Sequence, residues 1–119
     1  MPDEISVRVL DIVGGALAVS ADDGQAVHDK IAPLLREGKR VIVSFEGVNT
    51  IISAFLNAAI GQLYGEFPEE RIRELLLVEH MVPEDLALLK RVVDNSKRYF
   101  ANRPAFDEAW KEEVGDDEE

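Results

Sequence analysis

The apolar positions along the chain follow two periodicities, one typical of strands and one typical of helices. Residues 5–10 alternate between apolar and polar side chains, which predicts a strand. Residues 16–19 follow a glycine turn and predict a second, short strand that pairs antiparallel with the first. Residues 40–46 and 74–79 are mainly apolar runs, which are typical of strands buried in a parallel sheet.

Three further segments carry apolar residues at helical spacing. The first follows Asp22 and Asp23, which are good N-cap residues. The second covers residues 53–65 and begins at Ser53, which is placed to cap it, and the third covers residues 83–102. The order β-β-α-β-α-β-α implies right-handed crossovers. We therefore expect an α/β sandwich in which helices pack on a mixed, mainly parallel four-stranded sheet.

The charge of the chain limits its partners. Its 24 acidic and 13 basic residues give a formal net charge of −11. Residues 106–119 carry −7 of this charge and the rest of the chain −4. Binding to nucleic acid or to an anionic membrane needs a surplus of Lys and Arg. We therefore expect neither as a partner.

The length suits one compact domain over residues 1–103, followed by a short C-terminal part. Residues 104–114 include Phe106 and Trp110, which are four positions apart, and predict an amphipathic extension. Residues 115–119 combine a glycine with four acids and predict a disordered tail. The first residues are acidic where a secretion signal is basic, and no apolar run is as long as a membrane span. We therefore expect a cytoplasmic protein.

Conventional catalytic arrangements are absent from the sequence. Without cysteine there can be no disulfide, thiolate metal site or cysteine nucleophile. His28 and His80 lack partners at the spacing of a metal site or a catalytic triad, and no glycine-rich phosphate loop occurs. We therefore expect no enzymatic activity, no metal and no cofactor.

The most informative stretch is residues 41–56, where a predicted buried strand passes through a short loop into a helix that starts at Ser53. Serine is among the best N-cap residues, so stability alone can explain its position. A helix N-terminus also favours negative charge, and phosphorylation would add about −1.5 to −2 charge there. These residues alone leave open whether Ser53 only caps the helix or also has a regulatory role.

A predicted strand is followed by Gly47-Val48, Ile51, Ser53 and Phe55-Leu56, and later by a long helix with Asn95-Ser96-Lys97-Arg98-Tyr99-Phe100. In this pattern the chain resembles the STAS-like family of uncharacterised bacterial domains, which is similar to the STAS domains of anti-sigma-factor antagonists and sulfate transporters. The most specific part is residues 41–65, and the resemblance extends over most of residues 5–102. It implies a STAS-like α/β sandwich with a role in protein interaction.

The resemblance also implies a role for Ser53. In anti-sigma-factor antagonists, a serine that opens this helix is phosphorylated by a partner kinase, and Ser53 occupies the matching position. We therefore expect a non-catalytic regulatory or adaptor domain that binds a protein partner through the loop–helix surface of residues 47–57. A serine kinase-like ATPase regulator is the kind of partner implied. Besides Ser53, as phosphoacceptor or contact, the candidate partner surface consists of Asn49, Thr50, Phe55, Leu56 and Asn57.

Two alternatives accompany this hypothesis. The first is binding of a small anion or nucleotide at the same helix N-terminus, although residues 41–65 contain no basic side chain. The second is a structural homodimer held by Phe106 and Trp110, because aromatic residues are enriched at interface hot spots.

Overall fold

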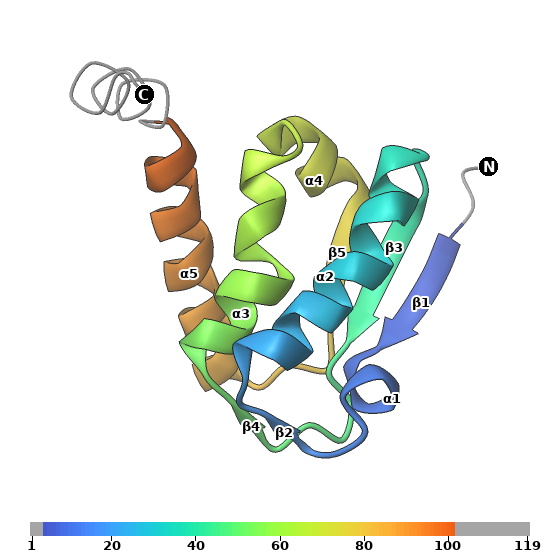
Figure 1. The fold of residues 1–119 in the computed structure, drawn as a ribbon, viewed down its shortest axis with the longest axis vertical. Helices are drawn as coiled ribbons and strands as arrows, with labels where there is room; N and C mark the ends of the chain where they lie inside the picture. Colours follow the sequence, from blue (N-terminus) through green and yellow to red (C-terminus); the bar gives the residue numbers. More distant parts are fainter. Residues whose placement is uncertain (1–3, 102–119) are drawn as a thin grey trace, which may run out of the picture.

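The computed structural model describes residues 4–101 and has an α/β fold built on parallel strands (Figure 1). Within these residues, the main sheet has three strands in the order β1-β3-β5, and a separate ribbon joins β2 to β4. Every pairing is parallel. The strands are β1 (Glu4–Arg8), β2 (Leu17–Ala18), β3 (Arg40–Ser44), β4 (Thr50–Ile51) and β5 (Leu76–Glu79).

The helices lie on one face of this sheet. Helices α2 and α4 pack on the sheet, α3 packs along α2, and α5 packs on α3 and on the short 3₁₀ helix η1 (Figure 1). In chain order the helices are α1 (Val9–Val13), α2 (Ala21–Arg36), α3 (Ser53–Ala59), η1 (Gly61–Gly65), α4 (Glu69–Leu75) and α5 (Pro83–Ala101).

The two faces of the sheet differ because side chains alternate along each strand. On the helix side, Val7 lies in register with Val43, and both are buried. On the other side, Ile42 lies in register with Leu77, which stays 41% exposed. The apolar run at residues 40–46 predicts a strand that is covered on both faces, but the described helices cover only one (Figure 1).

The short second strand differs from the prediction. Residues 16–19 were expected to pair antiparallel with residues 5–10, but β2 pairs in parallel with β4 instead. That prediction is wrong because the first strand ends at Arg8 and the chain turns through α1 before β2 begins. The predicted four-stranded sheet is not confirmed, since β2 joins the ribbon and leaves the main sheet with three strands.

Local capping also differs from the prediction. Ser20, and neither Asp22 nor Asp23, is the N-cap of α2, and its Oγ accepts a hydrogen bond of 3.0 Å from the backbone N–H of Asp23. The two aspartates lie in the first helical turn, where their charge favours the positive end of the helix dipole. The strand predicted at residues 74–79 is shorter in the structure, because residues 74 and 75 end α4 and only residues 76–79 form β5.

Some predictions fall outside the described residues, namely the amphipathic extension at 104–114 and the acidic tail at 115–119. Across residues 4–101, no helix combines the length and the apolar character that a membrane crossing requires.

Gly24 allows a close approach of α2 to α3. A Cβ atom at this position would collide with the carbonyl oxygen of Phe55 and would lie 2.9 Å from the Cβ of Ala58. A backbone carbonyl cannot swing aside as a flexible side chain can, so a larger residue would push the two helices apart.

We expect Gly24→Ala to lower the free energy of unfolding by about 1–3 kcal/mol, because overpacking costs more than the roughly 1 kcal/mol that alanine gains over glycine in a helix. Urea unfolding followed by circular dichroism measures this change. Gly15→Ala is the control, since its added Cβ meets no atom within 4 Å. Equal stability of Gly24→Ala and the wild type would contradict the proposed close packing.

Candidate interaction surface

The β2–β4 ribbon is held by a few backbone hydrogen bonds. The N–H of Asn49 donates to the carbonyl of Ala16 at 2.8 Å, and the N–H of Ile52 donates to the carbonyl of Ala18 at 3.1 Å. Each strand then leads directly into a helix, β2 into α2 and β4 into α3. The ribbon therefore lies where these two packed helices begin (Figure 1).

The ribbon has one buried face and one exposed face. Ala18 and Ile51 point into the core and are 0% and 8% exposed. The residues that alternate with them form the outer side, which we call the ribbon face. Its members are Leu17, Val19, Thr50 and Ile52.

Three of the four residues on the ribbon face are large and apolar. Leu17, Val19 and Ile52 are 57%, 42% and 39% exposed. Single exposed apolar residues are common on protein surfaces, but a group of them on one face is typical of an interaction site.

The loop before β4 is shaped by Gly47, whose φ of 81° lies in the left-handed region that favours glycine. A Cβ at this position would also lie 3.1 Å from Cδ2 of Leu10. In the same turn, the N–H of Val48 donates to the carbonyl of Phe45 at 3.0 Å. This turn carries the chain from β3 to the exposed Asn49 and Thr50.

Ser53 is exposed and is the first residue of α3. The N-cap position belongs to Ile52, and no side chain caps this helix end. The prediction that Ser53 caps the helix is therefore wrong, and its hydroxyl is not used in a capping bond. This weakens the structural explanation for a serine at this position.

Ser53 lies on the rim of a small groove between α3 and α5. The groove has a volume of about 240 Å³ and is lined by Ser53, Asn57, Leu88, Arg91, Val92 and Asn95. Arg91 is exposed and forms no ion pair or hydrogen bond with another described residue. A cation without a polar partner in the described part of the chain thus lines the same groove as Ser53.

The other candidate surface residues divide into two groups. Asn49, Thr50 and Asn57 are exposed. Phe55 and Leu56 are 0% exposed, so their expected place on the surface is wrong. They lie on the side of α3 that faces the core, where they contribute to the packing of α3.

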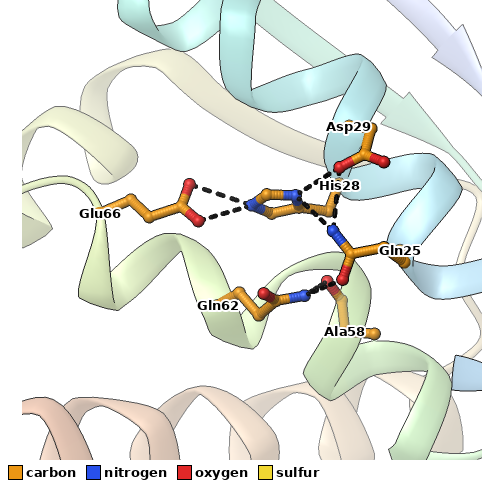
Figure 2. Close-up of polar contacts among 6 residues, drawn as sticks. All are labelled: Gln25, His28, Asp29, Ala58, Gln62 and Glu66. Atoms are coloured by element: carbon orange, nitrogen blue, oxygen red, sulfur yellow. Dashed lines mark hydrogen bonds and ion pairs between the residues drawn. The ribbon is translucent and has the colours of Figure 1, made fainter.

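A polar network links α2 to α3 and η1 around His28, whose side chain is nearly buried (Figure 2). Its Nε2–H donates to the carboxylate of Glu66 at 2.9 and 3.0 Å. Its Nδ1 lies 3.2 Å from both the amide nitrogen of Gln25 and Oδ1 of Asp29. Hydrogen bonds from Gln25 and His28 lower the pKa of the Asp29 carboxyl group.

The same network continues through Gln62, whose amide donates to Oε1 of Gln25 at 2.8 Å and to the carbonyl of Ala58 at 2.7 Å (Figure 2). The network contains no hydroxyl or thiol group that could act as a nucleophile. The described residues also contain no group of three or more His, Asp or Glu side chains able to hold a metal ion. The hydrogen bonds of the network support a role in fixing α2 against α3 and η1. Sequence spacing missed Glu66 because it lies 38 positions from His28.

A second charged cluster joins α4 to α5. Oε2 of Glu69 lies 2.9 Å from Nη2 of Arg73 and 2.8 Å from Nζ of Lys97. Hydrogen bonds from these two cations lower the pKa of Glu69, and the hydrogen bond that Lys97 donates to Glu69 raises the pKa of Lys97. Lys97 also lies 5.9 Å from the ring centre of Tyr64, and burial raises the pKa of that phenol.

The parallel strands and the helices on one face of the main sheet define an α/β domain, and its candidate surface is the segment that leads into α3. The family model for the STAS-like domain of unknown function (DUF4325) matches residues 23–86, and the chain belongs to this family. The matched residues run from the first turn of α2 to the start of α5 and include the candidate surface at residues 47–57. No curated protein and no solved structure matches the chain.

We expect Glu66→Ala to lower the free energy of unfolding by about 1–2 kcal/mol, because it leaves the buried Nε2–H of His28 without its acceptor. Urea unfolding at neutral pH measures the loss. Glu70→Ala is the control, since Glu70 is exposed and has no polar partner among the described residues. An equal loss in both variants would contradict a specific role for the His28 network.

Because the pKa of Glu69 is lowered in the fold, its charged pairs stabilise the protein above the ordinary value of 4.5 and lose that effect as the pH falls further. We therefore expect Glu69→Gln to be less stable than the wild type at pH 6, with the difference shrinking below pH 4.5. Thermal unfolding over this pH range measures it. A pH-independent difference, or the same profile in Glu70→Gln, would contradict the prediction.

Proposed function

We propose that this protein is a non-catalytic regulatory or adaptor domain that binds a protein partner through residues 47–57 together with the ribbon face. The observation that carries the proposal is the exposure of Leu17, Val19 and Ile52 on one side of the β2–β4 ribbon. Burying such side chains against a partner contributes about 25 cal/mol for each Å² of apolar surface removed from water.

The polar residues around the ribbon face suit such an interface. Asn49, Thr50 and Ser53 are exposed next to the apolar side chains and can supply directional hydrogen bonds. Interfaces commonly combine an apolar centre with a polar rim. The partner expected here therefore presents an apolar patch bordered by hydrogen-bonding groups, and a serine kinase-like ATPase regulator remains the class that we propose.

Phosphorylation of Ser53 provides a means of control. A phosphate would add about −1.5 to −2 charge beside an apolar face, and an apolar partner would then have to desolvate that charge. Arg91, which lines the same groove and has no pair among the described residues, is placed to stabilise the phosphate. Phosphorylation would thus stabilise the free domain and weaken the complex.

We expect Leu17→Asp, Asn49→Lys and Ser53→Asp each to weaken partner capture while leaving the fold intact. Leu17→Asp introduces a charge that the partner would have to bury, at a cost of several-fold or more in affinity. Capture from native cells with a tagged domain, followed by mass spectrometry, compares the variants with the wild type and also detects phosphate on Ser53.

Leu77→Asp is the matched control, because Leu77 is also an exposed leucine but lies on the open face of the main sheet. A partner held by the wild type and by Leu77→Asp, and lost by the ribbon variants, supports the surface. Equal capture by all variants would exclude it.

The two alternative functions give different results. Thermal stabilisation by inorganic phosphate or a nucleotide would favour binding of a small ligand near Ser53. A dimer in light scattering that Trp110→Ala dissociates would favour a structural homodimer.

A further inference from the structure

An apolar groove lies between β5 and α5, away from the ribbon face. It has a volume of about 240 Å³. Helix α5 packs on α3 and η1, and β5 pairs only with β3 among the described residues, so the space beside this sheet edge is left open. The apolar lining residues are Ile60, Ile72, Leu76, Val78, Leu89 and Val93.

One end of the groove carries the charged cluster of Glu69, Arg73 and Lys97. Two cations and one carboxylate give this rim a formal charge of +1. The groove therefore combines apolar walls with a positive rim, which fits an apolar segment that carries acidic side chains.

We propose that residues 104–114 of this chain fold back and occupy the groove. The structure describes α5 as far as Ala101, one turn beyond Lys97 on the groove rim. The few residues before Phe106 include Pro104, which interrupts a helix, and connections of two to eight residues commonly join neighbouring antiparallel helices. The segment therefore begins a few residues beyond the last described turn of α5.

The spacing of apolar residues in the segment matches the wall of the groove. Leu89, Val93 and Lys97 follow one another at intervals of four along α5. Phe106, Trp110 and Val114 have the same intervals. In a helix, either set spans about 12 Å, so an antiparallel helix from the segment would match the stretch of α5 between Leu89 and Lys97.

The charge of the segment agrees with this placement. Residues 106–119 carry −7, and the described body of the chain is itself acidic. Asp107 and Glu108 directly follow Phe106, which the antiparallel placement would bring beside Lys97. The positive rim would reduce the repulsion that this segment meets elsewhere on the domain.

Fluorescence of Trp110 tests the proposal directly, because the chain contains one tryptophan. In the full chain we expect a blue-shifted emission and several-fold weaker acrylamide quenching than in the urea-unfolded chain. Both should be independent of protein concentration. Emission and quenching like those of the unfolded chain would overturn the proposal, and so would shielding that appears only as the chain dimerises.

Two leucine variants locate the site. Leu89→Ser removes a wall of the groove and should return Trp110 toward the emission and quenching of the unfolded chain, while circular dichroism verifies that the domain stays folded. Leu77→Ser is the control, since Leu77 is on the open face of the sheet and does not line the groove. If both variants leave Trp110 equally shielded, the segment packs elsewhere and the proposal fails.

Disulfide trapping gives an independent measurement, because the chain has no cysteine of its own. In the double variant L89C/V114C, we expect an intramolecular disulfide to form several-fold faster than in A87C/V114C. Ala87 is exposed, and its position two residues before Leu89 puts it on the opposite side of α5. Equal rates would overturn the docking, even if Leu89→Ser failed to fold.

Discussion

The close packing of α2 against α3 is the contact on which the arrangement of the domain depends. Gly24 permits it, because any larger side chain would meet the backbone of Phe55. Both helices start directly after a strand of the ribbon. The distance between α2 and α3 therefore decides whether β2 and β4 lie close enough to pair. In this way the helix contact positions the ribbon face.

The same helix pair is stabilised further along by a different kind of interaction. Near Gly24, the contact is tight and apolar, with Phe55 fully buried. One turn further along α2, His28 reaches Glu66 and connects this helix to the end of η1 (Figure 2). Packing sets the separation of the helices, whereas directional hydrogen bonds limit sliding of one helix along the other. Together these contacts hold the starts of the two helices into which the short strands of the ribbon lead.

The sequence predicts the parts of the fold that follow a strong local pattern. The periodicity of apolar residues predicts the strands of the main sheet and the helix that begins at Pro83. The resemblance around residues 41–65 indicates the family to which the chain belongs. Other features depend on contacts between distant residues. The partner of β2 is set by helix packing, and Glu66 finds His28 only because η1 brings the chain back to α2.

The candidate surface could be located from the sequence but could not be resolved into individual side chains. Residues 49, 50, 53 and 57 are exposed as expected, whereas Phe55 and Leu56 face the core. A helix that starts at Ser53 must turn one side inward, and which side depends on α2. Leu17 and Val19 were missed because their strand was predicted to pair with residues 5–10, and only the parallel pairing with β4 brings them beside Ile52.

Helix α5 connects the two surfaces discussed above. Leu88, Arg91 and Asn95 line the groove near Ser53, while Leu89, Val93 and Lys97 line the groove beside β5. Between these two sides, Val92 and Ser96 are buried and hold α5 against its neighbours. A segment docked beside β5 would restrict α5 from one side, and a charge on Ser53 would attract Arg91 from the other. Because both effects act on one packed helix, the position of α5 links the proposed phosphoserine to the proposed docking of the C-terminal segment.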